Sequence, residues 1–287
     1  MKKIIACVDE TLSALHVSDY ASWAALRLAA PLQFLHVLDR HPEHAPVSDY
    51  SGSIGLGAQE SLLQQLGALD ERRSKVAQQH GREILDGLLR RCKDAGIGNV
   101  ESLQRHGSLV ETLFDLEPEA RLFVLGKQQA TEDGKAGKHL HLDHRVEQAI
   151  RSLARPVLVA STPYKQPESF ALAFDGSATS RKAVESVAGS PLLQGLHCHV
   201  VMAGEHSEAG QEQLFWARDC LGAAGFDVQL MVVSGEPEAA LPAYLESRAL
   251  DLLVMGAYGH SRIRQFIVGS TTTSLLRTSP VPVLVIR

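Results

Sequence analysis

The chain has 287 residues, a net charge of −5 and a hydrophobic content of 45%. This length predicts about two domains, and the ordinary balance of apolar and charged residues excludes a disordered or fibrous protein. The negative net charge provides no general positive field for a polyanion, so nucleic acid is not an expected partner.

The first residues predict a β-strand rather than a targeting segment. The apolar run after Met1 stops at Asp9, which is too early for the core of a signal peptide. No stretch approaches the roughly 18 apolar residues of a membrane span. Four widely spaced cysteines lack zinc-site or C-x-x-C spacing and are typical of reduced thiols. We therefore expect no membrane partner and a cytoplasmic location.

The two halves of the chain repeat one pattern of strands and helices. Each half begins with an apolar run that ends in an aspartate, Asp9 or Asp175. Short runs rich in Val, Ile and Leu alternate with helical segments such as 60–95 and 208–222, which predicts parallel sheets covered by helices. The matching pairs of segments are 4–9 with 172–175, 100–107 with 228–235, 122–126 with 252–256, and 155–160 with 281–286.

This repeat predicts an α/β fold of two tandem, doubly wound, five-stranded parallel-sheet sandwiches with right-handed crossovers. The segment 161–168 has two prolines and no apolar periodicity, which is typical of a linker. We therefore expect one domain at 1–162 and a second at 168–287. The stretch 40–57, rich in Pro, Gly, Ser and His, predicts a long mobile surface loop.

The most informative motif follows the predicted strand 252–256 and contains Gly256, Gly259, Gly269 and Ser270. The next segment, 271–277, predicts a helix. Gly269 and Ser270 would then lie at its N-terminus, where unpaired N–H groups and the helix dipole attract phosphate. The hydroxyls of Ser270, Thr271 and Thr272 complete the predicted phosphate site. Taken singly, a G-x-x-G loop and a Gly-Ser helix cap are also common structural features.

Asp175 follows the first strand of the second half, at the sheet edge where open parallel sheets bind ligands. Its carboxylate could accept hydrogen bonds from ribose hydroxyls or an adenine amine. It could equally cap a helix that begins near Ser177. Both interpretations stay open.

The spacing G-x2-G-x9-G-S over 256–270, followed by a helix and the strand Pro-Val-Leu-Val, resembles the ATP-binding class of universal stress proteins. The repeat extends this resemblance over nearly the whole chain, as in tandem members of the family. The resemblance implies the Usp fold, which is similar to adenine nucleotide alpha hydrolases, and a ligand that is ATP, or ADP or AMP, with Mg²⁺. It implies nucleoside contacts from Ala173, Phe174, Asp175, Ala203 and Met255.

The first half departs from the motif. Aligning the two closing strands without a gap places Asp143 and His144 where the second half has Gly269 and Ser270. A carboxylate at this position would repel the negative charge of a phosphate group. We therefore predict a degenerate, structural first domain that does not bind ATP in the family manner. In this family the closing strands of two domains pair across a pseudo-twofold axis, which implies an intramolecular pseudo-dimer, and a further homodimer stays open.

Three functions remain possible from the sequence. The first is a nucleotide-dependent regulator in the stress response, which the resemblance implies. The second is a slow ATPase or adenylyl-transfer enzyme, which the absence of a Walker lysine and of an obvious general base disfavours. The third is a nucleotide-independent dimeric scaffold. A metal site at His139, His141 and His144 is not preferred, because the spacing matches no standard site.

Overall fold

The computed structural model describes residues 1–11, 13–38, 56–127, 144–256 and 270–287. Its strands form one ten-stranded sheet with the order β3-β2-β1-β4-β5-β10-β9-β6-β7-β8. We call residues 1–160 the first half and residues 168–287 the second half. The strands of the first half are β1 (Lys3–Cys7), β2 (Leu32–Leu38), β3 (Val100–His106), β4 (Ala120–Gly126) and β5 (Val157–Ala160). The strands of the second half are β6 (Ser169–Ala173), β7 (His197–Ala203), β8 (Val228–Val233), β9 (Leu253–Gly256) and β10 (Val283–Ile286).

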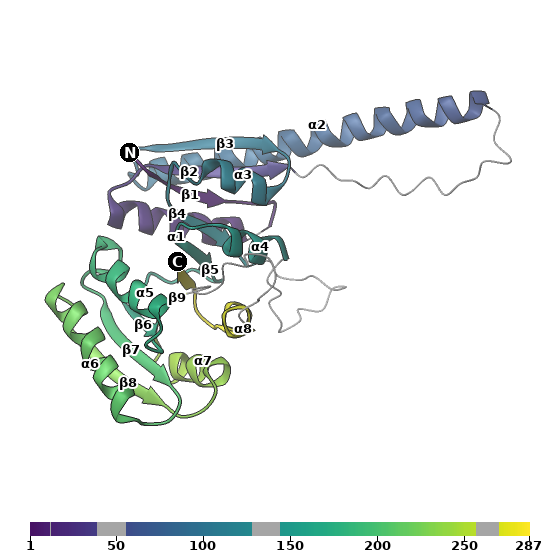
Figure 1. Ribbon diagram of the computed structural model, residues 1–287. Coiled ribbons are helices and arrows are strands. Elements are labelled where there is room, and N and C mark those ends of the chain that lie inside the picture. The colour runs from purple at the N-terminus through teal and green to yellow at the C-terminus, as the bar shows by residue number, and fades with distance from the viewer. Residues whose placement is uncertain (12, 39–55, 128–143, 257–269) are drawn as a thin grey trace.

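The same five-stranded unit therefore occurs twice, as the sequence repeat predicts. Within each half all neighbouring strands are parallel. The halves meet where β5 and β10 pair antiparallel, with Leu158 opposite Leu284. The predicted pairing of the closing strands is thus present. Because this junction reverses the strand direction, the carboxyl edge of one half lies beside the amino edge of the other (Figure 1).

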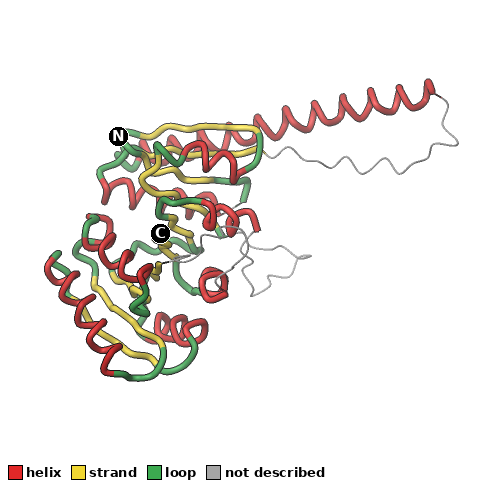
Figure 2. The backbone as a smooth tube through the Cα atoms, viewed as in Figure 1, coloured by secondary structure: helices red, strands yellow, loops and turns green. Residues whose placement is uncertain are grey.

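Helices cover both faces of this sheet (Figure 2). One face buries apolar residues of α1, α2, α5 and α6, together with the short helix η1, and the other buries apolar residues of α3, α4, α7 and α8. In the first half the helices are α1 (Ser13–Leu28), α2 (Leu56–Asp94), α3 (Leu109–Leu116) and α4 (His144–Ser152). In the second half they are α5 (Ala178–Ala188), η1 (Pro191–Leu193), α6 (Glu208–Ala223), α7 (Pro237–Ser247) and α8 (Ser270–Thr278). This arrangement is the predicted doubly wound fold.

The two halves share their hydrophobic core. On one face, Leu122 and Leu158 of the first half belong to the same buried cluster as Leu172 and Leu284 of the second. On the other face, Val159 lies in one cluster with Val283. A core that is continuous across the β5–β10 junction joins the halves through apolar burial as well as through strand hydrogen bonds.

The helices α2 and α6 occupy corresponding places but differ in length, with 39 and 16 residues. The amino-terminal part of α2 extends well beyond the sheet (Figure 1). On this extension Leu69 and Val76 are exposed. The C-terminal part packs on the core through Leu85 and Leu88. The predicted loop at 40–57 therefore ends earlier than expected, because α2 begins at Leu56, and the remainder of it lies outside the described residues.

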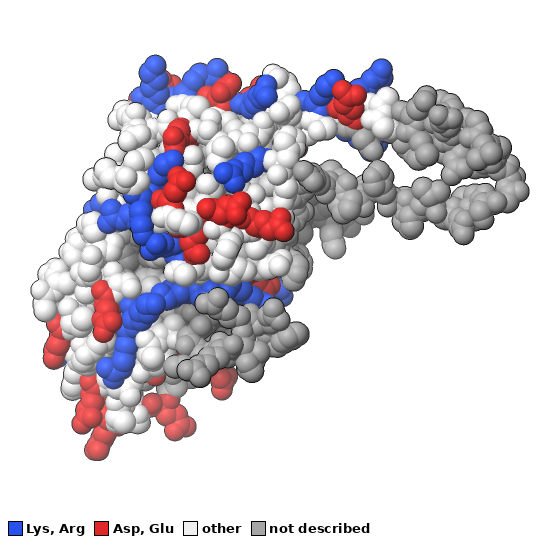
Figure 3. Space-filling view, turned by 45° about the horizontal axis from the view of Figure 1, so that its top comes forward, with Lys and Arg blue, Asp and Glu red and all other residues white. Residues whose placement is uncertain are grey.

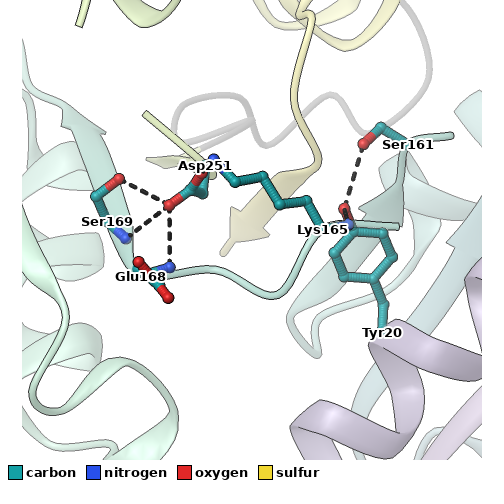
Figure 4. Close-up of polar contacts among 6 residues, drawn as sticks. All are labelled: Tyr20, Ser161, Lys165, Glu168, Ser169 and Asp251. Carbon is teal, nitrogen blue, oxygen red and sulfur yellow. Dashed lines mark hydrogen bonds and ion pairs between the residues drawn. The ribbon is translucent and has the colours of Figure 1, made fainter. Parts of the chain in front are cut away.

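The segment between β5 and β6 is fixed to both halves (Figure 4). The hydroxyl of Tyr20 on α1 lies 3.4 Å from Ser161 Oγ and accepts a hydrogen bond from the backbone N–H of Lys165. The ammonium of Lys165 forms an ion pair with Asp251, whose other oxygen accepts hydrogen bonds from the backbone N–H groups of Glu168 and Ser169. The linker predicted at 161–168 is therefore a bound segment.

The described helices include none that is both long enough and apolar enough to cross a membrane. All four cysteines are free. Burial raises the pKa of the Cys198 thiol to about 12, which keeps this thiol protonated at neutral pH. These thiols behave as small apolar side chains, in agreement with the interpretation of the sequence.

Candidate functional site

The candidate site lies at the carboxyl edge of β6 and β9 in the second half. These strands are neighbours, and Ala173 lies in register with Met255. The next residues along the chain are Phe174, which follows β6, and Gly256, which ends β9. Ala203 ends β7, the strand on the other side of β6. The structure thus brings the ends of three strands together, with Ala173, Met255 and Ala203 in neighbouring strands at one edge.

Gly256 permits a close approach between β9 and α5. A Cβ atom at this position would lie 2.5 Å from the carbonyl oxygen of Thr179 and 2.7 Å from its carbonyl carbon. Both atoms belong to the backbone of the first turn of α5, so a side chain would have to displace the helix. The sequence suggested a phosphate-loop role for Gly256, and the structure adds a packing reason for the same glycine.

Asp175 lies in the turn between β6 and α5. Its carboxylate accepts a 3.0 Å hydrogen bond from the backbone N–H of Ser177. Burial by itself would raise the pKa of Asp175, but the hydrogen bonds from Ser177 and Ser180 outweigh burial and hold its pKa below the usual value. The side chain is therefore ionised at neutral pH and can accept further hydrogen bonds.

Ser177, not Asp175, caps α5. The Ser177 hydroxyl accepts the hydrogen bond from the backbone N–H of Ser180 at the N-cap position. Asp175 precedes the cap by two residues and shapes the turn before it. The capping interpretation of Asp175 is therefore wrong, and the turn that it stabilises leaves the carboxylate exposed beside the strand ends.

An aromatic cluster lies behind Phe174 on the α5 and α6 side of the sheet. The ring of Phe174 stacks on Trp216 of α6 with centroids 6.2 Å apart. The guanidinium of Arg181 lies over the Trp216 ring at 4.4 Å and donates a hydrogen bond to the Gly176 carbonyl oxygen. The Phe174 side chain is buried in this cluster, whereas Met255 is buried on the opposite face. The two residues therefore flank the strand ends from opposite sides.

The helix α8 begins at Ser270, one residue earlier than the sequence predicted. It precedes β10, which runs parallel to β9, so the N-terminus of α8 lies at the same carboxyl edge as Asp175 and Gly256. Thr271 and Thr272 in its first turn are partly buried. The predicted residues Gly259 and Gly269 lie outside the described residues, and Ser270 is placed here by its backbone alone.

Glu238 is a carboxylate at this helix end that sequence reasoning missed. It lies in the first turn of α7 and accepts a hydrogen bond from the Thr271 hydroxyl. This hydrogen bond lowers the pKa of Glu238, so the carboxylate stays ionised at neutral pH. A phosphate at the N-terminus of α8 would approach a negative charge, and a bound cation would offset that repulsion. The sequence gives only a weak signal for Glu238, because this residue is simply one of the acidic residues in the segment that follows β8.

The equivalent edge of the first half is built differently. Asp9 is hydrogen-bonded to Thr11, and Gly126 ends β4 at the place where Gly256 ends β9. The residue after Gly126 is Lys127, whose side chain is only 1% exposed and whose ammonium donates a 3.0 Å hydrogen bond to the Ser279 carbonyl oxygen in the second half. The structure shows it buried between the halves, because its long side chain reaches past its own sheet edge.

Most of the other residues that the sequence analysis considered for a site in the first half lie outside the described residues. Asp143, His139 and His141 lie outside the described residues, and His144 is placed by its backbone as the start of α4. Among the residues that the structure describes, no group of three or more His, Cys, Asp or Glu side chains could hold a metal ion. The site of interest is therefore the edge formed by β6, β7, β9 and α8.

The space-filling view shows basic side chains across the middle of one face and acidic side chains at the lower end of the second half (Figure 3). Neither sign of charge dominates this face.

Comparisons with known proteins give one consistent family. The model of the Universal stress protein family matches residues 168–287. The universal stress protein Slr1230 of Synechocystis sp. is 36% identical over 290 residues, with full coverage of both chains. A universal stress protein structure from Archaeoglobus fulgidus has a TM-score of 0.74 at 20% identity and covers 99% of this chain and 98% of that one. A putative universal stress protein from Pseudomonas aeruginosa UCBPP-PA14 has a TM-score of 0.63 at 16% identity, with coverages of 100% and 93%.

Proposed function

This chain belongs to the universal stress protein family, and from that premise we propose that its second half binds an adenine nucleotide and acts as a nucleotide-dependent regulator in the stress response. We assign 168–287 as the nucleotide-binding domain and 1–162 as a degenerate partner domain. ATP with Mg²⁺ is the proposed ligand, and ADP or AMP would use the same nucleoside contacts. The cytoplasm is the proposed location, in keeping with the four free cysteines.

The observation that carries this proposal is the meeting of three features at one sheet edge. They are the ionised carboxylate of Asp175, the glycine at the end of β9 and the N-terminus of α8. A carboxylate can accept hydrogen bonds from ribose or adenine, and a helix N-terminus attracts phosphate. Ligands of open parallel sheets bind at this edge.

The polar contacts suggest how Mg²⁺ would take part. Magnesium is bound in proteins through one or two carboxylates together with phosphate oxygens and water. Glu238 supplies such a carboxylate next to Thr271 in the first turn of α8. We propose that Glu238 holds the metal, directly or through water, when a nucleotide with phosphates at α8 is bound. The ion would supply positive charge between the carboxylate and the phosphates.

Isothermal titration of ATP and Mg²⁺ into matched variants tests the assignment of the site. Asp175→Asn in the second half is expected to weaken binding about tenfold or more, because a charged hydrogen-bond acceptor is lost. The equivalent change in the first half, Asp9→Asn, is the control and is expected to leave the affinity unchanged. A stoichiometry of one site per chain is expected.

A second matched pair tests the phosphate end. Gly269→Asp imports the residue that the first half carries at the equivalent position and is expected to abolish binding, whereas Asp143→Gly is expected to have no effect. Two sites per chain would contradict the assignment of the first half. If the unchanged protein gave no heat and did not compete with a fluorescent ATP analogue, the scaffold function would replace this proposal.

A further inference from the structure

The helix α8 is held by the first half as well as by its own. Its first turn is tied to α7 through Thr271 and Glu238, as described above. Its middle contacts Glu147, a residue of α4 in the first half. The residue after α8, Ser279, accepts the hydrogen bond from Lys127, which also belongs to the first half. Two of these three attachments cross between the halves.

Glu147 is the centre of the contact between α4 and α8. Its side chain is only 6% exposed. One carboxylate oxygen accepts a 3.0 Å hydrogen bond from the Thr273 hydroxyl and pairs with Arg151 one turn further along α4. The other oxygen accepts a 3.2 Å hydrogen bond from Arg277. A buried carboxylate with this many donors has little freedom to move without losing contacts.

The internal repeat shows that this contact is a special feature of the first half. Aligning Val157–Ala160 with Val283–Ile286 without a gap places Glu147 opposite Thr273 and Arg151 opposite Arg277. Two identical halves with threonine at this position would bring two arginines together without a carboxylate between them. The single glutamate of the first half pairs with both arginines across the pseudo-twofold axis.

The C-terminal ends of α4 and α8 are each held by the other half of the chain. Lys127 of the first half donates to the Ser279 carbonyl oxygen after α8, and Arg287 of the second half donates at 2.9 Å to the Leu153 carbonyl oxygen after α4. The same alignment makes Leu153 and Ser279 equivalent. Cations at the C-terminal end of a helix satisfy its free carbonyl groups and interact favourably with its dipole. Lys127 of the first half therefore caps α8, and Arg287 of the second half caps α4.

These contacts fix the position of α8 along its own axis. The attachments at Thr273, Arg277 and Ser279 lie in the middle, near the end and just after the end of a nine-residue helix. The N-terminus of this helix is at the candidate phosphate site. Because a short helix moves as a rigid unit, a shift at its C-terminal end also moves its N-terminal N–H groups. Binding geometry of this kind depends on neighbours that hold the contacting groups in place.

We infer that Glu147, assisted by Lys127, is a positioning residue for the nucleotide site of the other half. The degenerate half thus determines how well α8 is placed to receive phosphate. This inference rests on the proposed function, because it concerns the affinity of the same site. Reciprocally, nucleotide bound at α8 stabilises the contact between α4 and α8, since coupling between two sites acts equally in both directions.

Asp251 supplies a matched control. Its side chain is 4% exposed and, like Glu147, it is a carboxylate with several donors, namely Lys165, Glu168 and Ser169 (Figure 4). It also joins parts of the chain that are distant in sequence. It precedes β9 at the amino edge of the second half, however, and its hydrogen bonds reach the linker rather than α8. Neutralising Asp251 therefore tests the effect of losing a buried carboxylate without loosening α8.

The first measurement is hydrogen exchange of the ligand-free protein. Glu147→Gln is expected to speed amide exchange in the peptide that covers 270–279, because it weakens the contacts that hold α8. Asp251→Asn is expected to speed exchange around the linker and β6 while leaving the α8 peptide unchanged. Equal protection of α8 in the unchanged protein and in Glu147→Gln would overturn the inference, whether or not the protein binds a nucleotide.

The second measurement separates affinity from stability. Glu147→Gln is expected to weaken ATP and Mg²⁺ binding about 5- to 10-fold, whereas Asp251→Asn lowers the melting temperature and keeps the affinity within about twofold. Thr273→Val removes a single contact of Glu147 and is expected to shift the affinity in the same direction by less, which provides a test should Glu147→Gln fold poorly. If both carboxylate variants lost affinity in proportion to their stability, Glu147 would be merely structural. If the unchanged protein bound no nucleotide, the proposed function itself would fail, and the exchange comparison would still decide whether Glu147 holds α8.

Discussion

The two halves of this protein share one fold but use equivalent positions for different purposes. Each half ends a central strand with a glycine that lies against the first helix of its half, Gly126 near Ser13 and Val17, and Gly256 near Thr179. Each half also begins with a strand followed by an aspartate, Asp9 or Asp175. Beyond these shared features the edges differ. In the second half the carboxylate of Asp175 is ionised, and in the first half Gly126 is followed by buried Lys127.

The difference indicates that equivalent positions of a duplicated domain can make different contacts. Two residues of the first half that depart from the second are Glu147, which contacts α8, and Lys127, which contacts the residue after α8. A polar or charged side chain of one half can contact the neighbouring half, where its hydrogen bonds are satisfied. The two halves therefore differ in the contacts that their equivalent positions make.

The largest expected effect is the pH dependence that buried Lys127 adds to stability. Burial lowers the pKa of Lys127 from 10.5 to about 8 in the folded protein. Below pH 8 both the folded and the unfolded chain hold this proton. Between pH 8 and pH 10.5 only the unfolded chain holds it, so the contribution to stability rises with pH in this window. The rise amounts to about 3 kcal/mol, since one pKa unit corresponds to about 1.4 kcal/mol.

Urea unfolding of the unchanged protein and of Lys127→Met between pH 7 and pH 10.5 measures this effect. The difference in free energy of unfolding between the two proteins should change by about 3 kcal/mol across the window, in favour of the unchanged protein at high pH. Lys182→Met, at an exposed position of α5, is the control and should show no such change. A difference that did not depend on pH would mean that Lys127 is charged in the folded protein throughout this range.

The next prediction compares the two glycines. Gly256→Ala would place a Cβ atom 2.5 Å from a backbone oxygen, whereas in Gly126→Ala the nearest atom is a side-chain methyl of Val17 at 3.1 Å. A side chain can yield by a few tenths of an ångström, but the backbone of α5 must move as a unit. We expect Gly256→Ala to lower the free energy of unfolding by about 2 kcal/mol and Gly126→Ala by less than about 1 kcal/mol.

Chemical denaturation without nucleotide is the appropriate measurement for this pair, because it excludes any stabilisation by ligand. Equal losses in the two variants would show that the closer approach at Gly256 relaxes at no cost. The second half would then have no packing requirement for glycine beyond that of the first.

A smaller effect is expected at Glu238, which has its ionised carboxylate beside Thr271. Glu238→Gln removes a negative charge from the N-terminus of α8, where anions are favoured. ATP without Mg²⁺ should therefore bind a few-fold more tightly to the variant than to the unchanged protein. With Mg²⁺ the gain should vanish or reverse. Titrations with and without Mg²⁺ measure both, and an affinity change that was the same in both conditions would exclude Glu238 as the metal carboxylate.

Much of the fold could be predicted from the sequence because its signals are local and occur twice. The apolar runs that became β4, β5, β9 and β10 and the Pro-containing linker each indicate their own structure, and the repeat fixes how they combine. The length of α2 was also visible in its helical periodicity. The sequence could not decide which residue caps α5, because serine and aspartate are both suited to an N-cap. The structure shows Ser177 in this position rather than Asp175.

The candidate site was predictable only in part. The strand-end residues Ala173, Asp175 and Met255 follow from the strand order, and the structure places them at one edge. Glu147 and Lys127 could not be recognised, because their partners are more than 100 residues away and belong to the other half. The alignment of the halves reveals that Glu147 replaces a threonine, but only the contact with Arg277 gives this difference a meaning.

The two tryptophans allow a comparison of the halves by fluorescence, because each half contains one. Trp23 lies on α1 in the first half, and Trp216 lies on α6, stacked on Phe174 and covered by Arg181. Phe174 directly precedes Asp175, so a nucleotide that contacts this strand end would disturb the environment of Trp216 and not that of Trp23. Trp23→Phe should therefore keep the change in fluorescence on titration with ATP and Mg²⁺, and Trp216→Phe should lose it. A response that survived in Trp216→Phe and vanished in Trp23→Phe would place the nucleotide in the first half, against the asymmetry that the contacts of α8 indicate.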